Sequence, residues 1–186
     1  MYWYGPILID VLWLVWITPF IFQRRRSGKR EVVQKAPTSR VGIALQVVGI
    51  AVLWLHIGSA DTWLMPLWRL IGSLAFGIAG AVMGTSAVRT LGKQWRIEAA
   101  LIADHELIQT GPYAFVRHPI YTSMLLMAIA TGFAVSQWPQ FVTGVVLFFI
   151  GLEIRVRAED GLLAGRFGPA FDAYRSRVSA YIPFMR

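Results

Sequence analysis

Five long apolar segments alternate with short polar stretches along the chain. They cover residues 3–22, 41–58, 67–90, 119–135 and 139–155. A helix needs about 20 mostly apolar residues to cross the roughly 30 Å hydrocarbon core of a bilayer, and each segment reaches or approaches that length. The pattern predicts an all-α, multi-pass membrane protein with about five transmembrane helices.

The polar stretches differ in character. Residues 23–40, "QRRRSGKREVVQKAPTSR", form a basic connector, whereas residues 59–66, "SADTWLMP", are nearly uncharged. The sequence "SQWPQ" at 136–140 predicts a tight turn between two helices. Beyond residue 155 the fifth segment continues into polar sequence, which predicts a cytoplasmic C-terminal helix. The first segment has no basic region ahead of it, so we expect it to stay in the mature protein and not to act as a signal peptide.

The composition agrees with a membrane protein. Of 186 residues, 56% are hydrophobic and 15% are charged, so five spans leave no room for a separate soluble catalytic domain. The chain has no cysteine, which excludes disulfides, thiolate metal ligands and a cysteine nucleophile.

The cations predict the orientation. Seven lie in residues 23–40, four between Arg89 and Arg117, and six from Arg155 onward, while Arg69 is alone at the opposite end of the spans. The positive-inside rule therefore places the N-terminus outside and the C-terminus inside. It also explains the net charge of +8 without a nucleic-acid partner. We expect the 91–118 loop and the C-terminal tail to meet on the cytoplasmic face.

Several familiar sites have little support. The glycines of the third segment include the pair Gly80 and Gly84, which favours close helix packing in a bilayer rather than nucleotide binding. The three histidines, His56, His105 and His118, are far apart and have no ligand partner one turn away, so we expect no metal site. No GxSxG motif indicates a serine nucleophile.

The stretch "GPYAFVRHPIY" at 111–121 places polar side chains where the fourth apolar segment begins. Pro119 suits the first turn of a helix, whose free amides and positive dipole end attract anions. Arg117, His118 and Tyr121 surround that end. The alternative is a snorkelling arginine beside an interfacial tyrosine.

A second polar group follows the fifth segment. Arg155 and Glu159 are four residues apart and share one helical face, so they can bind one ligand together. The alternative is a simple ion pair within the helix, worth a few tenths of a kcal/mol.

Together, these residues resemble the pattern of a known family. "DHELIQTGPYAFVRHPIY" followed by "RVRAEDGLLAGRFGPAFDAYRSRVSAYIPF" resembles the membrane methyltransferases typified by isoprenylcysteine carboxyl methyltransferase, a group related to phospholipid N-methyltransferases. The likeness covers about residues 92–184 and depends on RHPxY, RxxxE, FG followed by Tyr174, and a closing Ile-Pro. Two departures are Asp160, where a second Glu is usual, and Phe171, where Tyr is common.

The resemblance implies a helical membrane enzyme with a cytoplasmic pocket for S-adenosyl-L-methionine. On this resemblance, residues 59–186 form the methyltransferase core. Residues 1–58 form N-terminal transmembrane helices to which the sequence assigns no function. Arg155 would face the methyl acceptor. The positions expected to bind the cofactor are Glu98, His105, Glu106, Leu107, Ile108, Tyr113, His118, Pro119, Ile120, Tyr121 and Glu159.

The methyl acceptor stays open at this point. A carboxylate or thiolate acceptor needs no general base, whereas an amine must lose a proton, with His118 or Glu159 as candidate base. We expect a lipophilic acceptor that enters from the bilayer. The alternatives are a phospholipid amine N-methyltransferase and a small membrane scaffold or transporter. The absence of charged residues from the middle of the spans, apart from Asp10, argues against transport.

Overall fold

The computed structural model of the protein describes residues 4–27, 32–55, 65–97, 100–102 and 105–181. Most of these residues are helical. The long helices are α1 (Tyr4–Ser27), α2 (Ser39–Leu53), α3 (Leu67–Leu91), α4 (Pro119–Val135) and α5 (Trp138–Phe167).

Short elements gather at one end of the helices. Helix α6 (Pro169–Arg177) follows α5, and two 3₁₀ turns, η2 (Gly92–Gln94) and η3 (Gly111–Ala114), lie between α3 and α4. Strands β1 (Val32–Lys35) and β2 (Ala100–Ile102) pair antiparallel, with an irregularity between Val32 and Gln34. The expectation of an all-α chain is correct for the bundle but misses this sheet, because its two short strands come from connectors 65 residues apart that pair only in the fold.

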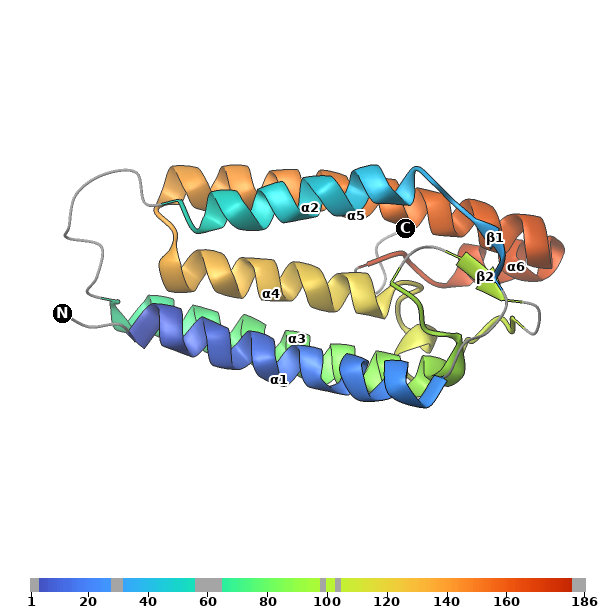
Figure 1. Ribbon diagram of the computed structural model, residues 1–186, viewed down its shortest axis with the longest axis horizontal. Helices are drawn as coiled ribbons and strands as arrows, with labels where there is room; N and C mark the ends of the chain where they lie inside the picture. The colour runs from blue at the N-terminus through green and yellow to red at the C-terminus, as the bar shows by residue number, and fades with distance from the viewer. Residues whose placement is uncertain (1–3, 28–31, 56–64, 98–99, 103–104, 182–186) are drawn as a thin grey trace.

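The five long helices form an elongated bundle (Figure 1). Helices α1 and α3 lie on one side, α2 and α5 lie on the other, and α4 runs between the two pairs. Helix α2 packs chiefly against α5, and α3 packs against α4 and α1. This arrangement brings the start of α4 and the second half of α5 to the same end of the molecule as β1, β2 and α6.

The helix bounds agree closely with the sequence pattern in α3 and α4. Helix α2 ends earlier than expected, at Leu53, where the Ser136 hydroxyl donates a 2.7 Å hydrogen bond to the Leu53 carbonyl. His56 lies outside the described residues. Helix α5 continues past residue 155 to Phe167 without a break, so the fifth apolar segment and the polar helix after it form one 30-residue element.

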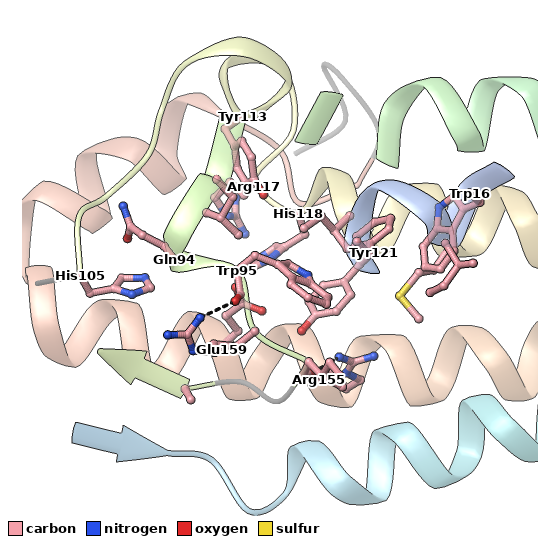
Figure 2. Close-up of a pocket in the computed structure, with 18 residues that line it drawn as sticks. Trp16, Gln94, Trp95, His105, Tyr113, Arg117, His118, Tyr121, Arg155 and Glu159 are labelled. Atoms are coloured by element: carbon pink, nitrogen blue, oxygen red, sulfur yellow. Dashed lines mark hydrogen bonds between the residues drawn. The ribbon is translucent and has the colours of Figure 1, made fainter. Parts of the chain in front are cut away.

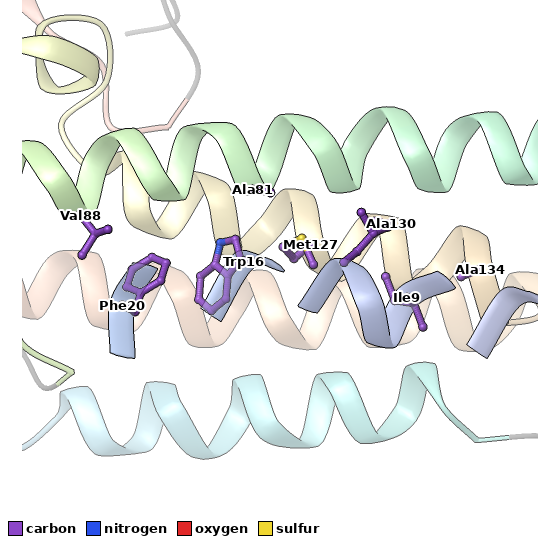
Figure 3. Packing of buried hydrophobic residues seen from close by; sticks show 9 residues of the cluster. Ile9, Trp16, Phe20, Ala81, Val88, Met127, Ala130 and Ala134 are labelled. Carbon is purple, nitrogen blue, oxygen red and sulfur yellow. The ribbon is translucent and has the colours of Figure 1, made fainter. Parts of the chain in front are cut away.

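A hydrophobic core joins α1, α3 and α4 (Figure 3). Trp16 and Phe20 of α1 lie 4.5 Å apart between ring centroids and pack beside Val88 of α3. The indole of Trp16 also donates a 3.1 Å hydrogen bond to the Ser123 hydroxyl of α4. This bond satisfies the only polar atom of a buried tryptophan and fixes the register of α1 against α4.

Glycines set the closest helix contacts. A Cβ on Gly84 would lie 2.7 Å from the indole nitrogen of Trp16, which confirms the close packing expected for the third segment. A second contact of this kind joins α2 to α5. There, a Cβ on Gly42 would lie 2.5 Å from the carbonyl oxygen of Gly151, so neither position has room for a larger residue.

The outer surface of the bundle is strongly apolar. Helical stretches Tyr4–Arg26 and Leu67–Gln94 are long and apolar enough to cross a membrane, whereas the apolar helices Ser39–Leu53 and Pro119–Val135 are shorter. Large apolar side chains exposed on α1, α3 and α5 include Ile7, Leu14, Ile71, Ile78, Val82, Val142 and Val146. Asp10 lies on this exposed face of α1 and not between helices.

Candidate functional site

A cavity of about 260 Å³ lies at the end of the bundle where α4 begins (Figure 2). One wall is apolar and comes from α1 and α4. The polar wall comes from α5, the residues just before α4, and Gln94 and Arg96; the other lining residues of the 91–97 segment are apolar. The lining residues are Trp16, Ile17, Phe20, Leu91, Gln94, Trp95, Arg96, Ile97, Ala100, His105, Tyr113, Arg117, His118, Ile120, Tyr121, Met124, Arg155 and Glu159.

The start of α4 is held by the chain that follows α6. The amides of Arg117 and His118 donate to the carbonyls of Ser179 and Ala180 at 2.8 and 3.1 Å. Pro119 occupies the first turn of α4, and Thr122 N–H bonds His118 O at 2.9 Å. The RHP sequence therefore lies beside a segment some 60 residues away in the chain, which fixes where the His118 side chain points.

Asp160 of α5 joins these two segments. Its carboxylate accepts a 3.1 Å hydrogen bond from Arg117 Nη2 and lies 2.8 Å from His118 Nε2. Arg117 Nη1 also donates to Val178 O at 2.5 Å. Burial raises the pKa of Asp160, but the hydrogen bond and charge of His118 and those of Arg117 outweigh burial and hold this pKa below its usual value.

Glu159 lies on the cavity side of α5, next to Asp160 in the sequence. Burial, then the Glu159 charge, raises the pKa of Tyr113 well above its usual value. Burial lowers the pKa of His105, with Glu159 opposing this shift and Arg166 and Arg96 adding to it. The His105 Nδ1 atom is buried without a hydrogen-bond partner in the described residues. The charge of Glu159 thus acts on both the Tyr113 hydroxyl and the His105 imidazole, which line the same cavity.

Arg155 lies one helical turn before Glu159 and is 6% exposed. Its Nη1 donates to Gln46 Oε1 and its Nη2 to Ile97 O, both at 2.7 Å. Its guanidinium carbon lies 4.7 Å from the centre of the Tyr121 ring. In the described residues no ion pair joins Arg155 to Glu159, so the simple intrahelical pair is not what the structure contains.

Helix α6 packs against the segment that carries Tyr113. The Tyr174 hydroxyl donates a 2.6 Å hydrogen bond to Tyr113 O, and burial raises the pKa of Tyr174 to about 12. Phe171 is fully buried, so the phenylalanine that departs from the family pattern fills space in the core. Asp160, the other departure, provides the charge that binds Arg117 and His118.

Comparison with known proteins identifies the family. The sequence profile of the isoprenylcysteine carboxyl methyltransferase (ICMT) family matches residues 73–165, half of the chain, and includes α4 and most of α5. The chain belongs to the ICMT family.

Relatives of this ICMT-family chain have two kinds of name. The nickel-cobalt-cadmium resistance protein NccN of Alcaligenes xylosoxydans xylosoxydans is 28% identical over 77% of this chain and 64% of its own length. The cobalt-zinc-cadmium resistance protein CzcN of Cupriavidus metallidurans is 27% identical over 77% of this chain and 63% of its own length. The protein-S-isoprenylcysteine O-methyltransferase of Schizosaccharomyces pombe is 25% identical over 61% of this chain and 49% of its own length. The chain thus spans less than two thirds of each of these relatives.

Seven of the positions predicted from the ICMT pattern line one cavity. They are His105, Tyr113, His118, Ile120, Tyr121, Arg155 and Glu159. Glu106, Leu107, Ile108 and Pro119 do not reach the cavity wall. Glu106 is exposed, and its amide bonds the Gln94 side chain at 2.9 Å. Pro119 is buried in the first turn of α4, where it shapes the helix start. Glu98 lies outside the described residues.

Sequence reasoning missed the contributions of α1 and of the 91–97 segment. Trp16, Ile17 and Phe20 are ordinary apolar residues of a predicted span, so nothing in their spacing marks them as lining a cavity. Gln94 and Trp95 follow the end of α3 and have no motif of their own. Within the described ranges, no group of three or more His, Asp or Glu side chains is arranged to hold a metal ion.

Proposed function

We propose that this chain is an integral membrane methyltransferase that uses S-adenosyl-L-methionine and methylates a carboxylate on a lipophilic, isoprenylcysteine-like acceptor. One observation supports the carboxylate above all. Arg155 is buried on the wall of a largely apolar cavity and has no ion-pair partner among the described residues. A buried cation that forms no salt bridge is costly, so it favours an anionic ligand. The name of the Schizosaccharomyces pombe relative, an O-methyltransferase of isoprenylcysteine, agrees with this class.

The polar wall of the cavity fits the methyl donor. Glu159 offers a carboxylate to ribose hydroxyls or to the ammonium of the methionine part. The first amides of α4, at Ile120 and Tyr121, precede the first intrahelical bond and favour an anionic group such as the methionine carboxylate. The buried, unpartnered His105 Nδ1 provides a further polar contact. At about 260 Å³ the cavity is slightly smaller than the roughly 300–1,000 Å³ typical of small-molecule sites.

S-adenosylmethionine, when bound, supplies a methyl group on a positively charged sulfur. The residues of this chain then have to align the acceptor and keep water away. Arg155 holds the acceptor carboxylate, while Trp16, Phe20 and Met124 line the apolar side where a lipophilic tail lies. A carboxylate is already deprotonated at neutral pH, so the site needs no general base.

An amine acceptor is the second candidate within the enzyme class. Deprotonating it would call for a base, and His118 Nε2 is already 2.8 Å from Asp160. The unpaired charge of Arg155 would also repel an ammonium group. Both features favour the carboxylate over the phospholipid amine.

The proposal includes five membrane spans, with α2, α4 and the first half of α5 crossing alongside α1 and α3. The N-terminus would be outside, and the cavity and α6 would be cytoplasmic, since a polar methyl donor has to enter from the cytosol. Residues 59–186 would form the methyltransferase core. Residues 1–58 would complete the apolar wall through Trp16, Ile17 and Phe20.

Donor binding tests the first half of the proposal. Purified protein should bind S-adenosylmethionine saturably in calorimetry. Glu159→Gln should weaken binding roughly tenfold or more, because one charge-assisted hydrogen bond is lost. Asp172→Asn, on the exposed surface of α6, removes the same charge away from the cavity and should leave affinity unchanged. Absence of saturable binding, or equal binding by Glu159→Gln, contradicts the donor site and favours a scaffold.

Acceptor assays test the second half. With methyl-labelled donor, a prenylated cysteine with a free carboxylate should be methylated, and base treatment should release labelled methanol from the ester. The same compound with its carboxylate amidated should not react. Label found in phosphatidylethanolamine derivatives instead would identify the amine methyltransferase.

A further inference from the structure

A buried glutamine interrupts the apolar face of α2. Gln46 is 4% exposed and belongs to the N-terminal region in which the sequence offers no motif. Its Oε1 accepts a 2.7 Å hydrogen bond from Arg155 Nη1. The amide can be oriented only this way, because the opposite orientation would place its NH₂ group against the N–H groups of the guanidinium. Gln46 therefore holds the Arg155 side chain from the neighbouring helix.

Every partner of the Arg155 guanidinium in the described residues is neutral. Besides the Gln46 amide, they are the Ile97 carbonyl at 2.7 Å and the Tyr121 ring at 4.7 Å. The Nε atom of Arg155 is buried without an acceptor. These contacts fix the position of the guanidinium, and no carboxylate of the described residues forms a salt bridge with it, although Glu159 lines the same cavity.

The residue type at position 46 matters for this result. A glutamate would accept the same hydrogen bond but would cancel the charge of Arg155. A leucine or methionine would keep the charge but remove an acceptor from a buried donor, which is costly. Gly42 and Gly151 bring α2 and α5 close enough for the short glutamine side chain to reach Arg155. Glutamine combines a fixed geometry with an unpaired charge.

We infer that Gln46 is a positioning residue that fixes Arg155 and preserves its charge for the anionic group of the acceptor. The inference rests on the proposed function, because it assigns the acceptor carboxylate to Arg155. It predicts that specificity for an anionic acceptor depends on a residue of α2 that does not line the cavity.

The test is Gln46→Glu, measured with a carboxylate acceptor and S-adenosylmethionine. The variant keeps the hydrogen bond and adds an ion pair, so it should fold and should bind the donor as the wild type does. The KM for the carboxylate acceptor should rise roughly 10- to 100-fold, as expected for loss of one charge-assisted contact. Gln34→Glu, the same change at an exposed position of β1, should leave KM unchanged.

A second variant separates charge from geometry. Gln46→Met leaves the Arg155 charge in place but removes its acceptor, so the KM should rise only a few-fold, with donor affinity unchanged. Wild-type methylation with an unchanged KM in both variants would overturn the inference alone. A wild type that methylates no carboxylate acceptor would overturn the proposed function, and the inference with it.

Discussion

Asp160 illustrates how much one side chain contributes to this site. Its carboxylate binds Arg117 and His118 just before α4, and Arg117 in turn binds the carbonyl of Val178 after α6. Asp160 and Arg117 thus connect α5, the residues just before α4 and the chain that follows α6. The two adjacent acidic residues differ in their contacts, because Glu159 lines the cavity, whereas Asp160 holds Arg117 and His118 in place.

Replacing Asp160 by Asn should therefore lower the stability of the fold. At pH 7 we expect a loss of about 1–3 kcal/mol, because partly buried charged donors lose their charged acceptor. The pKa of Asp160 is lower in the fold than its usual 3.8, so its contribution is present above that value and disappears as the pH falls through the folded-state pKa. The difference between the two proteins, measured by reversible unfolding in micelles, should shrink toward about pH 3.

Asp172→Asn serves as the matched control for this measurement. Asp172 is exposed on α6, and the change should alter stability by less than about 0.5 kcal/mol at any of these pH values. A stability difference for Asp160→Asn that stays constant between pH 7 and about pH 3 would contradict the role of its charge.

At the scale of the elements, glycines decide how closely α2 approaches α5. A Cβ on Gly151 would lie 2.5 Å from the carbonyl of Gly42 and 2.9 Å from the amide of Gln46. The two backbones touch at this point, and the contact places Gln46 within reach of Arg155. The contact between α2 and α5 therefore also determines how Arg155 is held at the cavity.

Gly151→Ala should force α2 and α5 apart and destabilise the protein by about 1–3 kcal/mol, the usual cost of overpacking. The same substitution at Gly161, also on α5, meets no atom within 4 Å. There alanine should be neutral or stabilising by up to about 1 kcal/mol, because it is the better helix former. Thermal unfolding followed by circular dichroism distinguishes the two; equal effects at both positions would contradict the close contact.

The whole molecule is polarised along its length. The helices present an apolar surface, while β1, β2, α6 and the cavity gather at one end. At the opposite end, Arg69 donates to the carbonyls of Phe133 and Gly132 at 2.8 and 3.1 Å and also to that of Ser136, so this single cation caps the end of α4. These hydrogen bonds give Arg69 a structural role at the end of α4.

The proposed orientation can be tested with single cysteines, because the natural chain contains none. Leu67→Cys, exposed at the start of α3, should react with an impermeant maleimide in intact cells. Gln34→Cys and Asp172→Cys should react only after permeabilisation, because the proposed orientation places the end with the basic connectors in the cytosol. Labelling of Gln34→Cys in intact cells would contradict the topology.

Local patterns in the sequence predict that the five long helices exist, although the ends of α2 and α5 differ from the prediction. Apolar runs predict α3 and α4 closely, because in such runs hydrophobicity alone determines which residues leave water. The distribution of cations also predicts that the 91–118 loop and the C-terminal tail lie at the same end of the bundle. The family pattern predicts six further positions that the structure brings together at the cavity: His105, Tyr113, His118, Tyr121, Arg155 and Glu159.

Other features depend on contacts between distant segments and leave no local signal. The pairing of β1 with β2, the bond from Gln46 to Arg155, and the contribution of Trp16 to the cavity each join residues more than 60 positions apart. A glutamine or tryptophan in an apolar run looks the same whether it faces lipid, a helix or a ligand. Hydrophobicity selects which residues are buried, but the packing of the helices selects their partners.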